Sequence, residues 1–405
     1  MNAPLSPALS RVARGQLCAG CGACAALAPS AISMQDQGGW LRPKQSAPLS
    51  AAQETAIART CPGLGQKVVA GDRQDDALWG PYVSMQTGHA TDSEIRFKGS
   101  SGGVLSQMLV HLLESGAVDA VIANTADPEK PTANLPLIAT DRAGVLAAAG
   151  SRYAPSAPLA GIADLDPAKR YAFVGKPCDA VAMRAMTDAD PALAAQVPVI
   201  LSFFCAGVPS LKGADKVLEA LGAPKEDTVA FRYRGNGWPG LATATLKDGS
   251  ERQMSYHDSW GKILSKHVQH RCKVCADGTG VAADLVCADA WESDEAGYPL
   301  FEEQEGTSLI VSRSAKGTQI LADAVAQGRI ETQDFEVRKL VVIQPGQRER
   351  RRALLARLLA LKLARRPTPR YQGLLLLAAA RQNSMKRNLT NFLGMLRRTL
   401  RRPAR

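Results

Sequence analysis

The chain has 405 residues, of which 45% are apolar and 21% charged; these proportions exclude wholesale disorder. Its length exceeds that of one ordinary hydrophobic core, so we expect two or three domains with connecting segments. The net charge of +11 is uneven, because residues 347–405 hold 17 Lys or Arg and one acid, Glu349, a balance of +16 that leaves −5 for the rest. The basic character therefore belongs to a tail, and the body is mildly acidic.

The cysteines, the N-terminal sequence and the apolar runs indicate the cellular compartment in which the protein is expected to function. Nine cysteines are too few for a disulfide scaffold in so long a chain, and eight of them lie in clustered or Pro/Gly-flanked settings typical of metal ligation. The N-terminal MNAPLSPALSRVARG lacks the apolar core of a secretory signal. The longest apolar run in the tail, Leu374–Ala380, is far shorter than the ~18 residues that a membrane span needs. We expect a cytoplasmic protein, with peripheral contact at the inner membrane face as an option.

The sequence pattern predicts three parts. Residues 12–66 are short, Gly/Pro-punctuated and Cys-bearing, which is typical of a small ferredoxin-like module, and a polar linker follows near 73–80. The predicted elements after it are a helix at 103–114, a strand at 117–124, a strand at 171–175, a helix at 179–186 and a buried strand at 197–205. Alternating strands and helices indicate an α/β body with a mixed sheet, here divided into 82–165 and 166–342. The helical, basic tail covers 347–405.

The first cysteine group is the strongest signal. Cys18, Cys21 and Cys24 are separated by two residues each, and Cys61 precedes Pro62. Such spacers let one tight loop direct three thiolates to the corners of a cubane, and a distant Cys-Pro supplies the fourth, as in bacterial ferredoxins. Zinc more often takes paired C-x-x-C motifs. The pattern therefore predicts a 4Fe–4S cluster and makes electron transfer the leading hypothesis.

Four further cysteines form a second candidate group: Cys178, Cys205, Cys272 and Cys275. The first two end predicted strands, where α/β sheets place cofactors, and the other two form a C-x-x-C loop. From spacing alone, a second four-thiolate site and buried small hydrophobes at Cys178 and Cys205 are equally supported. Cys287, inside an apolar run, is expected to be a core residue.

Several motifs together resemble one family. CAGCGAC with Cys61-Pro62, FKGSSGG, GKPCDAVAMRAM, FFCAGVPS, FRYRGNGWPG and RCKVCADGTGVAADLVCADAW occur in this order over about residues 12–335. This order resembles the beta-subunit family of coenzyme F-420 hydrogenase/dehydrogenase, which includes reductases of chlorophyll precursors. The resemblance implies FAD and one or two 4Fe–4S clusters, with Cys178, Cys205, Cys272 and Cys275 as ligands of the second. Asp179 stands where relatives commonly carry Gln.

The residues around two turns are the candidates for flavin binding. Ser100, Ser101, Gly102 and Gly103 precede an apolar helix, where free N–H groups and the helix dipole suit a pyrophosphate, although an ordinary helix cap has the same composition. The resemblance implies that this loop contacts FAD. Ser151, Tyr153 and Ser156 form a second candidate, with a plain turn as the alternative. Lys176 could place positive charge beside a reduced flavin.

Few residues suggest chemistry beyond electron transfer. His257 is the most plausible proton donor, and a solvated loop residue is the alternative; His111, inside a helix pattern, is expected to be structural. Arg232, Arg234 and Trp238 fit either a pocket for an acidic aromatic substrate or the cap of a sheet edge.

The tail alternates Arg/Lys with Leu/Ala at helical spacing in RERRRALLARLLALKLARR and again in SMKRNLTNFLGMLRRTLRR. Such helices lie on an anionic membrane surface, dock on an acidic partner or pack on the body of the same chain. Nucleic acid is not expected as a partner, because the tail has few aromatic residues and no recognised module.

These observations predict an iron–sulfur flavoprotein oxidoreductase. Electrons from a donor such as a ferredoxin or a partner redox subunit would pass through two 4Fe–4S clusters to FAD, which can deliver a hydride to a small organic acceptor. The alternatives are a non-catalytic electron-transfer subunit and a zinc-stabilised binding protein.

Overall fold

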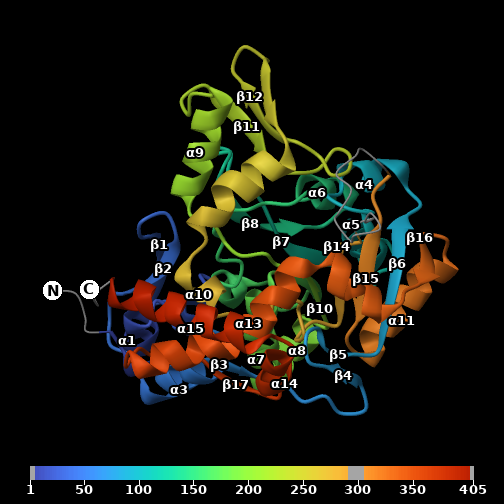
Figure 1. Ribbon diagram of the computed structural model, residues 1–405. Coiled ribbons are helices and arrows are strands. Elements are labelled where there is room, and N and C mark those ends of the chain that lie inside the picture. The colour runs from blue at the N-terminus through green and yellow to red at the C-terminus, as the bar shows by residue number, and fades with distance from the viewer. Residues whose placement is uncertain (1–4, 291–304, 402–405) are drawn as a thin grey trace.

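The computed structural model describes residues 5–290 and 305–401. Within these residues the largest sheet has eight strands in the order β16-β6-β15-β14-β10-β9-β7-β8 (Figure 1). Its strands are β6 (Ser84–Ala90), β7 (Ala120–Ala126), β8 (Asn134–Ala139), β9 (Tyr171–Gly175), β10 (Val199–Phe203), β14 (Leu285–Asp289), β15 (Ser308–Ser312) and β16 (Ile330–Asp334). The mixed α/β fold expected from the sequence is confirmed.

The direction of the strands positions the site. The central strands β14, β10, β9 and β7 are parallel, and antiparallel strands flank them on both sides. The carboxyl ends of the central strands therefore meet at one edge of the sheet, where α/β proteins place ligands. The segments 82–165 and 166–342 contribute strands to this same sheet, so they form one body.

Helices cover both faces of the sheet. On one face α5 (Val104–Glu114), α6 (Arg142–Ala147) and α11 (Ala315–Ala326) share a hydrophobic cluster with the strands. On the other face α7 (Pro177–Ala189), α8 (Pro191–Gln196) and α12 (Leu340–Ile343) do so. All five residues of β9 are buried, as expected for a parallel strand that is covered on both sides.

The N-terminal module packs against this second face. Its elements are α1 (Pro7–Arg14), α2 (Ala23–Leu27), the antiparallel pair β1 (Ile32–Asp36) and β2 (Leu41–Gln45), α3 (Ala51–Thr60) and β3 (Gly65–Lys67). Where a plain linker was expected, β4 (Gln74–Asp76) and β5 (Gly80–Tyr82) form a small hairpin. Its turn is held by the Asp76 carboxylate, which accepts the N–H groups of Leu78 and Trp79.

A three-stranded antiparallel sheet projects from the body, at the top of Figure 1. It consists of β11 (Thr228–Arg232), β12 (Ala242–Leu246) and β13 (Glu251–Met254), with α9 (Leu211–Leu221) beside it. The remaining short elements of the body are α4 (Ser93–Lys98), η1 (Ile162–Asp164), η2 (His257–Ile263), η3 (Leu264–His267), α10 (His270–Lys273) and η4 (Val337–Lys339).

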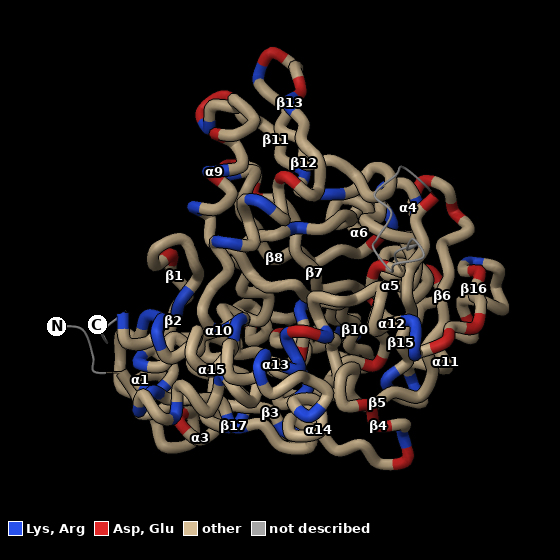
Figure 2. Tube along the Cα trace, viewed as in Figure 1, with Lys and Arg blue, Asp and Glu red and all other residues tan. Residues whose placement is uncertain are grey.

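The basic tail packs on the body of its own chain. It contains α13 (Pro345–Leu363), β17 (Arg370–Gln372), α14 (Leu376–Arg381) and α15 (Met385–Leu400). Leu354 and Leu361 of α13 share a core cluster with Val12, Leu17 and Val274. The strand β17, which the helical pattern did not predict, pairs in parallel with β3 of the N-terminal module. Figure 2 shows the Lys and Arg residues concentrated on these helices.

None of the helices described here is both long and apolar enough to cross a membrane.

Candidate cofactor-binding site

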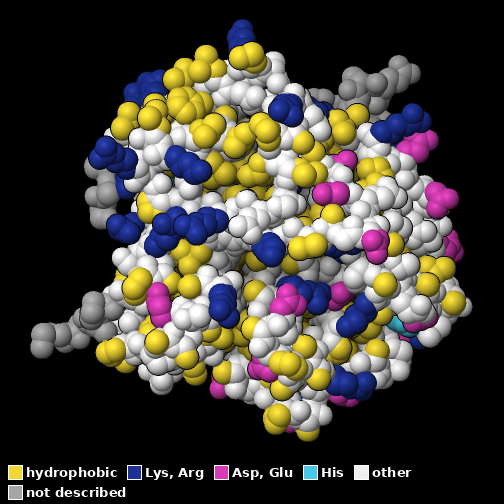
Figure 3. All heavy atoms as spheres, turned by 90° about the horizontal axis from the view of Figure 1, so that it is seen from below, with side chains coloured by type: hydrophobic (Ala, Val, Ile, Leu, Met, Phe, Trp, Pro, Cys, Tyr) yellow, Lys and Arg dark blue, Asp and Glu magenta, His cyan; other side chains and the backbone are white. Residues whose placement is uncertain are grey.

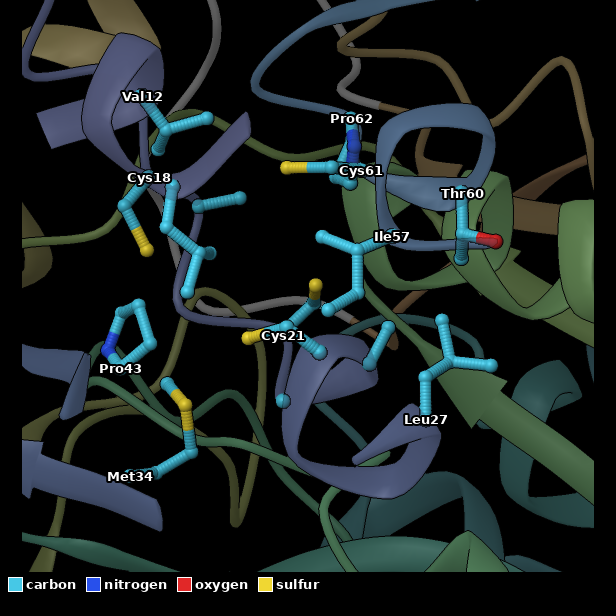
Figure 4. A pocket seen from close by; sticks show the side chains of 15 residues that line it. Val12, Cys18, Cys21, Leu27, Met34, Pro43, Ile57, Thr60, Cys61 and Pro62 are labelled. Carbon is cyan, nitrogen blue, oxygen red and sulfur yellow. The ribbon is translucent and has the colours of Figure 1, made fainter. Parts of the chain in front are cut away.

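The first cysteine group surrounds one pocket. Cys18, Cys21, Cys24 and Cys61 line it together with apolar side chains such as Ile57. In Figure 4 the side chains of Cys18 and Cys21, which belong to one loop, and of Cys61, at the end of α3, extend into the same space. The set of donors is all sulfur, which suits iron–sulfur clusters or zinc.

Two glycines allow the loop to take this shape. Gly20 and Gly22 have φ values of +77° and +91°, which side-chain-bearing residues rarely adopt. A Cβ on Gly22 would lie 2.7 Å from the backbone nitrogen of Ala160. The C-x-x-C-x-x-C loop is therefore pressed against the segment that follows Ser156, and the N–H of Leu159 donates to the carbonyl of Cys21.

The thiols of this group influence each other. Burial raises the pKa of Cys24 to about 12, and the neighbouring Cys18 and Cys61 contribute to the rise. Burial likewise raises the pKa of Cys61 to about 11, with a contribution from Cys18. Crowded, buried thiols of this kind are costly to ionise unless a metal centre compensates the negative charge.

The second cysteine group assembles at the carboxyl edge of the sheet. Cys178 follows β9 and Cys205 follows β10, and these two strands are parallel neighbours. Burial raises the pKa of Cys205 to about 12, and Cys272 and Cys275 add to the rise. The N–H of Val208 donates to Sγ of Cys272 over 3.4 Å. The structure thus brings together the four cysteines that the family resemblance grouped.

Within the described residues, no group of three or more His, Cys, Asp and Glu side chains is arranged to hold a single metal ion. A tetrahedral zinc site requires all four sulfurs at about 2.3 Å from one ion. A cubane binds each thiolate through a different iron and accepts a wider arrangement.

A buried ion pair lies between the two groups. Nζ of Lys176 is 2.6 Å from the Asp179 carboxylate and donates to the Ser156 hydroxyl at 2.8 Å. Both charged residues are buried, and Asp179 is wholly so. Burial raises the pKa of Cys21 and of Cys178, and the Asp179 carboxylate contributes to both rises. Asp179 is therefore within electrostatic reach of both cysteine groups.

The predicted phosphate loop has one hydroxyl without a partner. Among the described residues, Oγ of Ser100 is buried and has no hydrogen-bond partner. Ser101, in contrast, donates to the carbonyl of Thr307 at 2.7 Å. Gly103 is the N-cap of α5 with φ +73°, and a Cβ on Gly102 would lie 2.7 Å from the backbone of Gly88 and of Ser308. The N-terminus of α5 and the Ser100 hydroxyl fit a phosphate, whereas the glycines are also required by packing.

The second predicted flavin segment runs from this loop towards the cysteines. Ser151 forms a β-bridge with Arg234, and a Cβ on the preceding Gly150 would lie 3.8 Å from the carbonyl of Lys98, at the end of α4. Ser156, five residues further on, is buried against Lys176. The segment 151–160 therefore connects the phosphate loop with the first cysteine group.

Sequence reasoning missed an aromatic cluster. The ring of Tyr153 lies 4.8 Å from that of Trp260 and 5.8 Å from that of Tyr233. The guanidinium of Arg234 lies over Tyr256, 5.0 Å from its ring centroid, and Nη1 is 2.7 Å from the Asp289 carboxylate. Tyr256 and Asp289 come later in the chain than the FRYRGNGWPG motif that contains Tyr233 and Arg234. The signal in the sequence that could have indicated the cluster is the alternation of aromatic and charged residues near Tyr256 and Asp289.

The remaining residues singled out from the sequence are two arginines, one histidine and the ninth cysteine. Arg234 is buried and paired with Asp289. Arg232 donates to the Thr243 hydroxyl, and its buried Nε has no hydrogen-bond partner among the described residues. His257 is exposed at the start of η2. Cys287 is buried in β14 within the hydrophobic core, as expected.

Two family models match the chain. Residues 85–163 match the model for the N-terminal part of the coenzyme F420 hydrogenase/dehydrogenase beta subunit, and residues 168–338 match the model for the C-terminal part. Together they span more than half of the chain. They include the second cysteine group, but neither the first group nor the basic tail.

Individual proteins agree with these models. The coenzyme F420 hydrogenase subunit beta of Methanosarcina barkeri is 26% identical over 65% of this chain and 85% of its own length. The chloroplastic 7-hydroxymethyl chlorophyll a reductase of Oryza sativa subsp. japonica is 25% identical over 57% of this chain and 47% of its own length. A chain in the F420-reducing [NiFe] hydrogenase complex from Methanosarcina barkeri superposes with a TM-score of 0.52 at 23% identity, covering 70% of this chain and 96% of that one, which shows a shared fold. The chain belongs to the coenzyme F420 hydrogenase/dehydrogenase beta-subunit family.

Proposed function

We propose that this chain is an iron–sulfur flavoprotein oxidoreductase that works with a partner redox subunit. Its relatives are named as hydrogenase and dehydrogenase subunits and as a chlorophyll a reductase, all of them redox proteins. When bound, 4Fe–4S clusters would supply single-electron transfer, and FAD would combine two electrons with a proton from solvent for transfer as a hydride to an organic acceptor. The eight cysteines in two neighbouring groups are the observation that carries the proposal.

Cys18, Cys21, Cys24 and Cys61 would hold one cluster, and Cys178, Cys205, Cys272 and Cys275 the other. Apolar side chains line the pocket of the first group and would exclude water from it. The tail helix α13 contacts the second group: Nη1 of Arg350 donates to the carbonyl of Cys205 at 2.9 Å. Cations near thiolate-bound clusters compensate their negative charge, which is one of the means by which proteins set a reduction potential.

The flavin would be held by residues that the structure brings to one region. Among the described residues the hydroxyl of Ser100 has no hydrogen-bond partner and no side chain caps the N-terminus of α5. Both groups would bind the pyrophosphate, which the helix dipole also favours. Ser151 follows Gly150, which lies near the carbonyl of Lys98 just before this loop, and Ser151 and Tyr153 would contact the rest of the cofactor. Lys176 is paired with the Asp179 carboxylate and donates to the Ser156 hydroxyl, so the charge that it would place near the flavin is compensated by its partner. His257, exposed to water, stays the candidate proton donor.

The alternative is an electron-transfer subunit without an acceptor site of its own. It is favoured by Arg234, because this arginine is already neutralised by Asp289 and does not present a free charge to an acidic substrate. Reduction of a small organic acceptor by the isolated chain would support the oxidoreductase, and strict dependence on a partner enzyme would support the relay subunit.

The test is the absorption spectrum of anaerobically purified protein together with iron, sulfide and flavin assays. Two cubanes correspond to about eight irons per chain. Cys178→Ser and Cys18→Ser should each lose about half of the iron, because each removes a ligand of one cluster only. Cys287→Ala is the control and should keep all of it. Full iron content in Cys178→Ser, Cys205→Ser and Cys272→Ser alike would refute the second site.

A further inference from the structure

The two long helices of the tail expose a set of large apolar side chains. We call this set the tail surface: Leu359 and Leu363 of α13, and Met385, Leu389, Leu393 and Leu400 of α15. Met385 is 89% exposed, Leu400 68% and Leu363 65%. Figure 3, in which the molecule is seen from below, shows apolar side chains gathered over its upper part, with Lys and Arg between and around them.

The order of residues along α15 separates the apolar and basic side chains. Met385, Leu389 and Leu393 are spaced by four, so they lie on one side of the helix, and at 100° per residue Leu400 falls in the same sector. By the same rotation Lys386 and Arg397 lie directly beside this sector. α15, with the sequence MKRNLTNFLGMLRRTL, contains no acidic residue. The exposed side is thus an apolar stripe bordered on one side by cations and on the other by the residues that pack on the body.

This stripe continues, on its exposed flank, the apolar side that holds the helix on the body. Met395 is the buried residue of α15, and Phe392 and Leu396 pack with it against a core cluster that includes Leu361. Arg357 of α13 donates to Asn391 at 3.0 Å. Because the packing uses these residues, Leu389 and Leu393, which are 58% and 52% exposed, are left over for contact with something outside the chain.

We propose that the tail surface binds the surface of an anionic lipid membrane, with α13 and α15 lying in the plane of the headgroups. Helices of this kind have Lys and Arg on the polar side and Leu and Phe on the other, and anionic lipids attract the cations while the apolar side enters the acyl boundary. An exposed apolar stripe beside a row of cations, on a helix without an acidic residue, favours an anionic lipid surface. The proposal does not depend on the cofactors, and the tail lies outside the residues matched by the family models.

The experiment is vesicle flotation with the full chain. Vesicles of phosphatidylcholine with about a third of phosphatidylglycerol should carry the protein upward, and vesicles of phosphatidylcholine alone should not, because the attraction needs surface charge. Salt should weaken the binding, since it screens the exposed charges. The double variant Leu389→Gln/Leu393→Gln should bind roughly tenfold more weakly, since two exposed leucines no longer enter the acyl boundary.

The matched control is Val229→Gln/Ile138→Gln, which changes two similarly exposed apolar residues, 51% each, on β11 and β8; it should bind as the unchanged chain does. The triple variant Lys386→Gln/Arg397→Gln/Arg401→Gln should lose the preference for phosphatidylglycerol. Circular dichroism should show all variants folded. Absence of flotation, equal binding to both kinds of vesicle, or unchanged binding of Leu389→Gln/Leu393→Gln would overturn the proposal. A concentration-dependent dimer that this variant abolishes would overturn it in favour of a second copy of the chain.

Discussion

Nη2 of Arg271 donates to the carbonyl oxygen of Pro62 at 2.8 Å, so the loop that bears the second C-x-x-C is tied to the Cys-Pro of the first group. Nη1 of the same arginine donates to the hydroxyl of Tyr371, which in turn donates to the carbonyl of Val274. One buried guanidinium therefore joins both cysteine groups and the tail strand β17. The two groups are held as a single unit, and the tail is a structural part of it.

Tyr371→Phe tests this junction. The change removes the acceptor of a charged hydrogen bond and the donor to Val274, and it leaves buried Arg271 with one partner fewer. We expect the free energy of unfolding, measured with urea, to fall by about 1.5–3 kcal/mol. Tyr82→Phe, which loses only the bond to Gln74, should have a smaller effect. Equal effects of the two changes would show that Arg271 does not depend on Tyr371.

The ion pair of Lys176 and Asp179 should be strongly coupled. Asp179→Asn leaves a buried ammonium without its counter-charge, so we expect a loss of about 3–5 kcal/mol in the free energy of unfolding. The double variant Lys176→Met/Asp179→Leu should lose much less than the sum of its two single variants, because no unpaired charge stays buried. Glu219→Gln, which breaks the exposed pair with Lys216, is the control and should change little. If the losses of the two single variants add up to the loss of the double variant, the two charges do not interact.

Two neighbouring serines should affect flavin binding differently. Ser100→Ala removes a hydroxyl that has no partner among the described residues, so it should weaken FAD binding with little change in the free energy of unfolding. Ser101→Ala breaks the bond to Thr307 and should cost about 0.5–1.5 kcal/mol of stability instead. Flavin content after purification and urea unfolding measure the two effects. Unchanged FAD affinity in Ser100→Ala would place the pyrophosphate elsewhere.

Gly102→Val is a poor test of the same loop. A Cβ there would lie 2.7 Å from two backbone atoms, so its loss of flavin would not separate a blocked phosphate site from a displaced loop.

His111 should make the protein less stable in mild acid. It is buried in α5, and burial lowers its pKa from the ordinary value of about 6.5. Between the lowered pKa and about 6.5 the unfolded chain binds the proton more readily than the folded one, so stability rises with pH in this window and is lost as the pH falls through it. His111→Gln should therefore show a smaller decrease in unfolding free energy from pH 7.5 to 5.5 than the unchanged chain. His257→Gln, at an exposed position, should show the same decrease in unfolding free energy as the unchanged chain. If His111→Gln shows that same decrease, groups other than His111 cause the loss of stability in acid.

The sequence determined the local features. The spacing of Cys18, Cys21 and Cys24 defines a tight loop by itself, since only a few backbone angles lie between the thiols. Helical spacing predicted the helix at 103–114, which the structure shows as α5 from Val104 to Glu114. A run of apolar residues likewise predicted β9 at its observed bounds, Tyr171–Gly175. In each case the information lies within about ten residues.

Only the tertiary structure decided which residues that are far apart in the sequence lie side by side. Cys178 and Cys205 come together because β9 and β10 are parallel neighbours, an order that periodicity does not encode. The same holds for the pair of Arg234 and Asp289 and for β17 beside β3. The tail illustrates the reason most clearly: its helical pattern fits lipid, a partner or the body equally well. Leu354 and Leu361 are buried against the N-terminal module, so α13 packs on its own chain, while the apolar stripe on α15 stays exposed. Amphipathic spacing gives the direction of an apolar face, and only the packing of the whole chain determines what covers it.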